Sequence, residues 1–332
     1  MPQRLVPALK YLLSLGFAIA LFYYLYKDAD TDALLAVFEW EDAPWIGLSV
    51  LAGLFSHWSR SSRWRIALKP LGHTPRAYTT FFAVMSTYFI NLFVPRLGEF
   101  VRAGLLKRTD QVPMEQSFGS IIAERAVDLV VLGLLVLLTL WIEFEKIGGF
   151  VQREASGTLG FLAERKEWIA LTLLALVVLG VLGMRLLWKN RHSWPLLRKL
   201  WDFTLGIKSG LLSILRLSPR MKAWYVLHTL NIWLMYYFMG YLLFFCTPET
   251  TALSPLSGLT VLAMGAIGMA LPSPGGVGTY HLFVAATFIA YGLSDAAGKD
   301  FAFLMHSTQT LGVLFLGGGS FLISLSFGRK KV

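Results

Sequence analysis

Long apolar segments alternate with short polar clusters along the whole chain. The unbroken apolar segments cover residues 11–26, 45–69, 124–141, 168–188, 223–245 and 301–327. Their lengths approach or exceed the roughly 20 residues that a helix needs to cross about 30 Å of hydrocarbon. The pattern predicts an all-α polytopic membrane protein in which residues 1–332 form one transmembrane domain.

A further apolar segment, residues 77–107, is broken in its middle by Pro95 and Gly98. Proline removes a helix donor and clashes with the preceding turn, so we expect one helix to end near Val94 and another to start after Gly98. Each piece is too short to cross a membrane, and charged residues flank the whole segment. The pattern therefore predicts a re-entrant helical hairpin.

A second broken segment, residues 256–291, is interrupted at Leu271-Pro-Ser-Pro-Gly-Gly-Val-Gly-Thr-Tyr-His281, with a new helix expected after Gly278. The order helix, helix, broken hairpin, helix thus occurs twice, in half-repeats of about 1–145 and 165–332. The predicted orientation of the second half is inverted, as in inverted-topology transporters. We expect the two hairpins to meet near the middle of the membrane and to line a cavity there.

Composition and charge support a membrane location. Apolar residues make up 55% of the chain and charged residues only 15%, which excludes an ordinary soluble domain. The net charge of +10 comes from Lys and Arg clusters beside apolar segments, so it indicates orientation and anionic lipid rather than nucleic acid. These clusters predict a multi-pass protein of the cytoplasmic (inner) membrane with both termini in the cytoplasm.

Two other polar regions have open interpretations. Arg60, Arg63 and Arg65 lie toward the far end of the apolar segment 45–69, where they are either interfacial anchors or contacts for lipid phosphates. Residues 195–217 have apolar positions at helical spacing, which suggests an interfacial helix or, alternatively, a packed linker. The single cysteine, Cys246, supports neither a disulfide nor a thiolate metal site, and we expect no cofactor.

Charged residues in and near the first break are the main candidates for a site. Glu99 and Arg102 have the i,i+3 spacing of a pair, and Arg96 lies at the break itself. Ionisable groups at membrane depth are costly and indicate function, the alternative being a surface pair beside a proline kink. With the helix N-termini, Arg96 and Arg102 predict an anionic head group as ligand. Arg125 and Asp128 either form an ion pair at the surface or face the hairpin.

Enzymatic motifs are absent from the sequence. An enzyme needs a nucleophile with a base or a metal cluster, yet the histidines of the apolar segments occur singly and no Gly-x-Ser-x-Gly, His-Glu-x-x-His or Walker motif is present. We therefore expect a protein that is not an enzyme. His281 is either a proton-coupling group, since its charge changes near neutral pH, or a packing residue.

The run Pro95-x-x-Gly98-Glu99-x-x-Arg102, the Glu124-Arg125-x-x-Asp128 cluster and the Pro274-Gly-Gly-Val-Gly278 turn together resemble the flippase-like domain family. That family is typified by the transmembrane region of lysylphosphatidylglycerol synthase, the multiple peptide resistance factor. The synthases continue into a soluble aminoacyl-transferring domain, whereas this chain ends at Val332, so we do not expect synthase activity. The resemblance implies transfer of a lipid from the inner to the outer leaflet, with matching residues Asn91, Pro95, Gly98, Glu99, Arg102, Glu124, Arg125, Asp128, Pro274, Gly275, Gly276 and Gly278.

The predicted function is therefore a flippase-like translocase for an anionic phospholipid or a lipid-linked precursor. The alternatives are a membrane enzyme of lipid head-group modification, in the pathway of phosphatidylglycerol aminoacyl transfer, and a scaffold for a partner enzyme. The expected partners are an anionic membrane lipid and, in the scaffold alternative, a lipid-modifying enzyme. The sequence predicts no nucleic-acid partner and sets no oligomeric state.

Overall fold

The computed structural model describes residues 42–144, 195–271 and 273–327, together with residues 16, 19–20 and 22–27 and short pieces between 171 and 189. Every regular element in these ranges is a helix. Most of the expected segments 11–26 and 168–188, both chain ends and Pro272 lie outside the described residues. Two described stretches are long and apolar enough to cross a membrane, Pro219–Cys246 and Asp295–Ser326.

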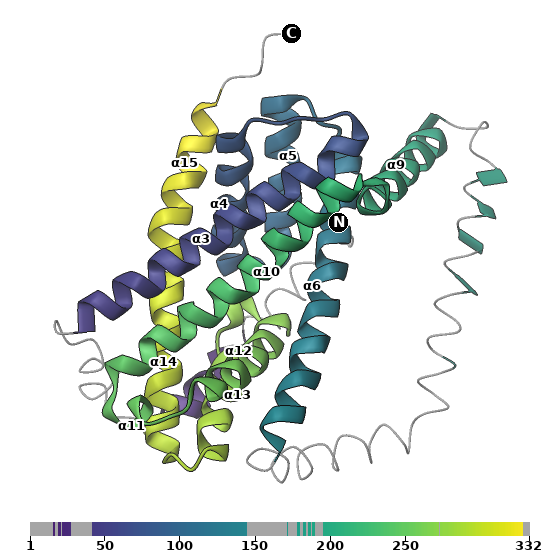
Figure 1. The fold of residues 1–332 in the computed structure, drawn as a ribbon. Helices are drawn as coiled ribbons and strands as arrows, with labels where there is room; N and C mark the ends of the chain where they lie inside the picture. Colours follow the sequence, from purple (N-terminus) through teal and green to yellow (C-terminus); the bar gives the residue numbers. More distant parts are fainter. Residues whose placement is uncertain are drawn as a thin grey trace.

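Helices α3 (Ala43–Leu68) and α10 (Pro219–Tyr241) lie side by side across the molecule (Figure 1). Short polar side chains join them: the Ser49 hydroxyl donates to the Met239 carbonyl at 2.6 Å, and the Asn231 amide donates to Ser59 Oγ at 2.6 Å. Small residues allow close approach of helix backbones, and such hydrogen bonds hold helices together in an apolar medium. The pair forms a central support against which both hairpins pack.

The first hairpin consists of α4 (Ala77–Phe93) and α5 (Leu97–Asp110). The end of α4 confirms the prediction from Pro95, but α5 begins at Leu97 instead of after Gly98. The reason is Arg96, whose left-handed backbone (φ 67°) makes the turn by itself. The helices run antiparallel, because Arg76 before α4 contacts Asp110 at the end of α5, with 3.1 Å between Nε and Oδ1.

The second hairpin consists of α12 (Pro255–Ala270) and α13 (Thr279–Ala290), joined through a short turn at Pro274–Gly276. Positive φ angles at Gly275, Gly276 and Gly278 let the chain reverse there, which residues with a Cβ rarely allow. At the open end, Thr260 and Tyr291 hydroxyls are 2.7 Å apart, so these helices are also antiparallel. The start of α13 at Thr279 confirms the prediction of a helix after Gly278.

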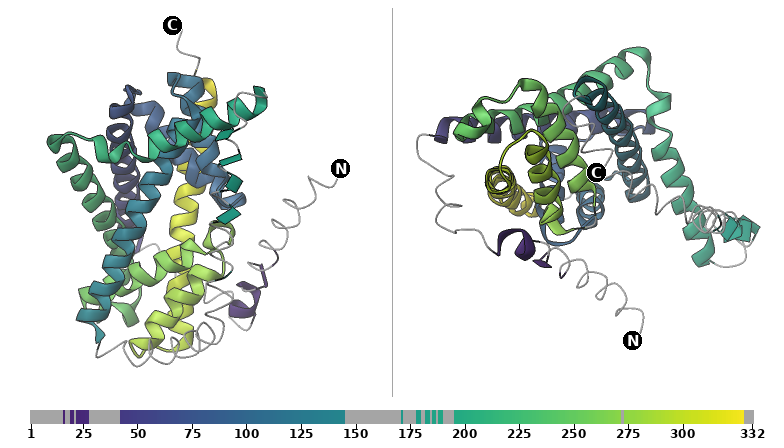
Figure 2. Two further views of the ribbon diagram at one scale, coloured as in Figure 1. Left: turned by 90° about the vertical axis from the view of Figure 1, so that its right-hand side faces the viewer. Right: turned by 90° about the horizontal axis from the view of Figure 1, so that it is seen from below.

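The remaining helices surround the hairpins. Helix α6 (Met114–Ile142) begins well before the expected residue 124, and the last helix, α14 (Asp295–Gly312), continues through a π-helical turn at Val313–Gly317 into α15 (Gly318–Ser326). Figure 1 and the left view of Figure 2 place the first hairpin near α15 and the second beside α14, toward opposite ends of the molecule. Short helical turns at Lys69–Leu71, Ile214–Arg216, Leu242–Cys246 and Pro248–Thr251 connect the helices.

Helix α9 (Pro195–Leu211) packs along the start of α6, which agrees with the packed-linker alternative. Glycines make this contact close: a Cβ on Gly119 would clash with the Ile207 backbone, and one on Gly210 would clash with the Gln116 carbonyl. Such small-residue contacts are typical of helix pairs in membranes. Contact of α9 with a membrane surface stays a prediction.

Candidate cavity between the two hairpins

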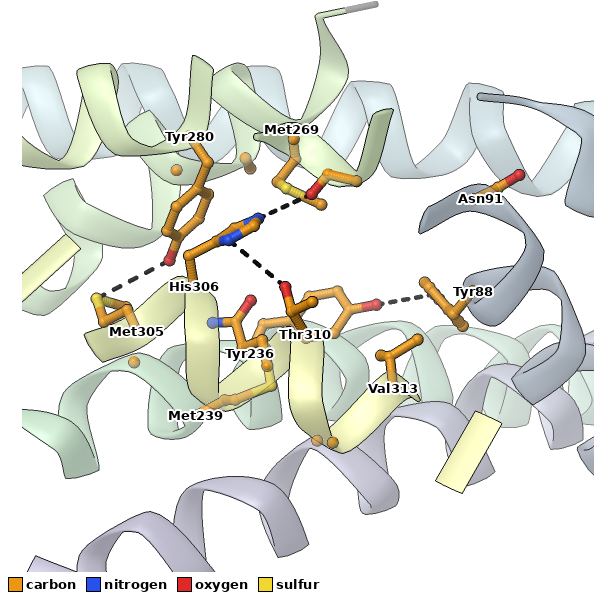
Figure 3. Close-up of a pocket in the computed structure, with 18 of the residues that line it drawn as sticks. Tyr88, Asn91, Tyr236, Met239, Met269, Tyr280, Met305, His306, Thr310 and Val313 are labelled. Carbon is orange, nitrogen blue, oxygen red and sulfur yellow. Dashed lines mark hydrogen bonds between the residues drawn. The ribbon is translucent and has the colours of Figure 1, made fainter. Parts of the chain in front are cut away.

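A cavity of about 580 Å³ lies between the breaks of the two hairpins. In Figure 3, Tyr88 and Asn91 come from α4 on one side and His306 from α14 on the other. The hairpin tips touch beside the cavity, because a Cβ on Gly275 would lie 3.3 Å from the Leu92 side chain. The volume lies within the range of small-molecule sites, roughly 300–1,000 Å³.

Asn91 organises the break of the first hairpin. Its Oδ1 accepts a hydrogen bond from the Gly98 N–H at 2.8 Å, and its Nδ2 donates to Glu99 Oε2 at 3.3 Å. This position requires glycine, because a Cβ on Gly98 would collide with the Thr87 carbonyl. The amide thus satisfies a backbone donor that the break leaves free, as an apolar environment requires.

Glu99 and Arg102 do not pair with each other, so the expected i,i+3 pair is wrong. Both turn toward α6, where Arg125 lies 3.0 Å from the Glu99 carboxylate and Glu124 lies 3.0 Å from the Arg102 guanidinium. The Arg102 guanidinium also stacks 3.8 Å from the ring centre of Trp64. These neighbours bury Arg102 behind the cavity wall, away from any ligand there.

Two of the arginines of α3, Arg60 and Arg63, are neither interfacial anchors nor lipid contacts at the surface. Arg60 and Arg63 are buried, and their guanidinium groups lie 2.6 Å and 2.8 Å from the Asp128 carboxylate. Arg63 also lies 3.8 Å from Glu124. Arg65 donates to the Pro75 carbonyl instead. The face of α6 that carries Glu124, Arg125 and Asp128 therefore points toward α3 and the hairpin.

Four arginines share three carboxylates in this network, which leaves one positive charge in excess. The members are Arg60, Arg63, Arg102, Arg125, Glu99, Glu124 and Asp128. Arg96 adds a further charge: it is exposed, it lines the cavity, and none of the carboxylates in the described part of the chain pairs with it. Its guanidinium instead reaches the Ala270 carbonyl of the other hairpin at 3.5 Å.

Aromatic hydroxyls extend this polar wall. Tyr236 Oη accepts a hydrogen bond from Arg60 at 3.2 Å and is 3.1 Å from Tyr88 Oη, as the dashed line in Figure 3 marks. The His57 ring lies against Tyr88, with 4.2 Å between ring centroids. Sequence reasoning missed both tyrosines, because single tyrosines in apolar helices carry no distinguishing pattern.

Two histidines support the second break. His306 Nε2 is 2.8 Å from the Gly275 carbonyl, and His281 Nδ1 accepts from the Gly278 N–H at 3.3 Å. The rings of Phe22 and Tyr26 cover His281 with centroid distances of 5.3 Å and 5.5 Å, while His306 lines the cavity. His281 thus has packing contacts, and proton coupling by it stays a prediction.

Anion binding by the helix N-termini stays a prediction, and one N–H group at each break already has a partner. The N–H groups of Gly98 and Gly278 are already bound to Asn91 and His281. The acidic Glu99 also lies in the first turn of α5. Positive charge at this cavity therefore comes mainly from the arginine side chains.

Comparison with protein families found a matching family. A family model described as "Lysylphosphatidylglycerol synthase TM region" matches residues 11–317. The chain belongs to this family. It is accordingly a membrane protein related to lipid head-group modification or lipid handling, and the resemblance drawn from its motifs is confirmed. Comparisons with curated proteins and with solved structures found no match.

The structure divides the predicted site residues of this family member into two groups. Those that line the cavity are Asn91, Pro95, Arg96, Glu99, Arg125, Asp128, Gly275 and Gly276. Those that do not line it are Gly98, Arg102, Glu124, Pro274, Gly278 and His281. The second group supports the first through the hydrogen bonds, ion pairs and close backbone contacts described above. Together they form a cavity with an excess of positive charge and largely apolar walls.

Proposed function

We propose that the chain moves an anionic phospholipid or lipid-linked precursor between the leaflets of the cytoplasmic membrane without acting as an enzyme. The observation that carries this proposal is Arg96, an arginine without a carboxylate partner in the described ranges, placed in the cavity between two broken helices. A guanidinium fork binds phosphate through charge-assisted, bidentate hydrogen bonds. The family's relation to lipid handling supports a lipid as the source of that phosphate.

The proposed architecture is an inverted repeat with re-entrant hairpins and both termini in the cytoplasm. This proposal is supported by the packing of each half on the other. The first hairpin packs on α15 of the second half, and α12 of the second half packs on α6 of the first half. Helices α3 and α10, which occupy equivalent positions in the two halves, pack on each other. Such reciprocal packing is expected when two repeats enclose one site near the membrane midplane.

Translocation requires polar atoms along the path of the head group, because a phosphate without partners does not cross hydrocarbon. The described side chains provide them. Arg125 is about one-third exposed at 34% and lines the same cavity as Arg96, and the Tyr88 and Tyr236 hydroxyls continue the polar wall. The lipid tails would meanwhile remain among apolar side chains.

The test is exchange of a labelled phosphatidylglycerol between the leaflets of liposomes that contain the purified protein. We expect Arg96→Gln to reduce the exchange rate about tenfold, which corresponds to about 1.4 kcal/mol, because one charge-assisted contact is lost. Arg96→Lys should retain part of the rate, since it keeps the charge but loses bidentate geometry. Arg220→Gln, at an exposed position at the start of α10, is the matched control and should leave the rate unchanged.

Exchange equal to that of protein-free liposomes, across several anionic lipids and with an imposed proton gradient, would reject intrinsic translocation. The scaffold alternative would then be preferred, and a partner enzyme would be sought by co-purification. If Arg96→Gln and Arg220→Gln reduce exchange equally, the central role of Arg96 is wrong even though transport stands.

A further inference from the structure

An apolar groove of about 530 Å³ lies between α6, α10 and α12, next to the central cavity. Leucines from all three helices line it, among them Leu135, Leu230 and Leu256. Trp233, Tyr237 and Leu262 line both the groove and the central cavity, so one wall separates the two spaces. The groove therefore lies directly beside the cavity, on the side of the apolar faces of α6, α10 and α12.

Trp233 places a polar atom in this shared wall. Its indole Nε1 is buried and has no hydrogen-bond partner in the described part of the chain. The neighbouring Tyr237 hydroxyl already donates to the Pro255 carbonyl at 3.0 Å, and Asn231 donates to Ser59. A buried donor without an acceptor costs stability, so an indole N–H left free between two pockets indicates a ligand acceptor.

The chemistry on the two sides of Trp233 identifies the class of ligand. The cavity side contains arginines and tyrosine hydroxyls, whereas the groove side is almost entirely apolar. A glycerolipid changes from polar to apolar at its ester groups, and an ester carbonyl accepts a hydrogen bond. We propose that the groove holds an acyl chain of the lipid whose head group occupies the cavity, with Trp233 Nε1 donating to the ester carbonyl between them. This rests on the proposed function for the position of the head group.

Neighbouring residues on α6 provide the first test. Leu135 lines the groove, while Leu134 is 61% exposed and lines neither space, so Leu135→Trp fills the groove and Leu134→Trp is its matched control. The probe is phosphatidylglycerol with a diazirine in its acyl chain, used with the protein in nanodiscs. We expect photolabelling of α10 and α12 near Leu230 and Leu256, reduced at least threefold by Leu135→Trp and unchanged by Leu134→Trp.

The second test compares ester-linked with ether-linked lipid. Trp233→Phe keeps an aromatic ring but removes the N–H, so binding of diester phosphatidylglycerol should weaken about three- to tenfold, the equivalent of one hydrogen bond. Binding of the diether analogue, which has no carbonyl, should be unchanged by the same substitution. An equal loss for both lipids would overturn the role of Trp233.

These experiments measure binding and not transport, so their failures are distinguishable. Labelling in the groove without leaflet exchange would reject the proposed function and keep the acyl-chain site. The acyl-chain site would be rejected if Leu135→Trp and Leu134→Trp were labelled equally. It would also be rejected if Leu230→Cys, in a Cys246→Ser background, formed a crosslink between two copies of the chain. In the second case the groove would be covered by another copy of the chain.

Discussion

The first hairpin contacts α6 through ion pairs, whereas the second hairpin contacts α14 through neutral hydrogen bonds. Glu99 and Arg102 of the first each have an opposite charge on α6. In the second, His306 bonds to the Gly275 carbonyl, and no residue of α12 or α13 in the described ranges forms an ion pair. The first hairpin breaks at Pro95 and Arg96, whereas the second breaks at Gly275, Gly276 and Gly278.

The difference shows that one backbone arrangement is compatible with two kinds of support. Ion pairs are not needed to stabilise the break of a hairpin, since none is formed by the described residues of the second hairpin. The charges of the first hairpin therefore have another consequence: they give one side of the cavity an excess of positive charge. In the proposed function, this asymmetry places the phosphate beside the first hairpin and leaves the second as a neutral wall.

Removing one partner of a buried ion pair should have the largest effect. Arg102→Met leaves Glu124 with only the more distant Arg63, and such an uncompensated charge costs about 3–5 kcal/mol of the free energy of unfolding. Adding Glu124→Gln to it should recover stability, because the unpaired charge is removed. Unfolding in detergent mixtures measures both, and a double variant less stable than Arg102→Met would contradict the pairing.

The positions of the breaks follow from the sequence because they depend on local chemistry. Pro95 ends α4 at Phe93, and the glycines near Gly278 start α13 at Thr279, as predicted. The exact start of α5 was missed, because it depends on the left-handed backbone of Arg96, a conformation uncommon in residues other than glycine.

The partners of the buried charges do not follow from the sequence. The i,i+3 spacing of Glu99 and Arg102 predicts a pair, but α6 offers each a closer partner, and sequence does not reveal how two helices are rotated against each other. The same holds for Arg60, which pairs with Asp128 from a distant segment. His306 and Trp233 are single residues in apolar helices, so their contacts appear only when the helices are packed.

A glycine substitution should have an intermediate effect on the first hairpin. Gly98→Ala places a methyl group against the Thr87 carbonyl, a backbone atom that cannot move aside, and should cost about 1–3 kcal/mol of unfolding free energy. Gly104→Ala on the same helix is the control, because open space surrounds it, and it should stabilise α5 by up to about 1 kcal/mol. Equal stability of the two variants in detergent unfolding would show that the tip of the hairpin opens easily.

The smallest effect is expected from removing a neutral hydrogen bond in the second hairpin. The Thr279 hydroxyl donates to the Gly268 carbonyl at 2.9 Å and lies 2.6 Å from Ser273 Oγ, so it joins α12, the break and α13. Thr279→Val keeps the shape of the side chain and removes the hydroxyl, which should cost about 1 kcal/mol of unfolding free energy, since hydrogen bonds between membrane helices average near 0.6 kcal/mol.

The control for this substitution is Thr287→Val in the same helix. Thr287 is buried as well, but its hydroxyl bonds only to the Phe283 carbonyl of its own helix, so its loss should change stability by less than about 0.5 kcal/mol. A cost for Thr279→Val as large as that of Arg102→Met would mean that the second hairpin depends on its polar contacts as strongly as the first. The contrast between charged and neutral support would then describe the chemistry of the two hairpins but not their stability.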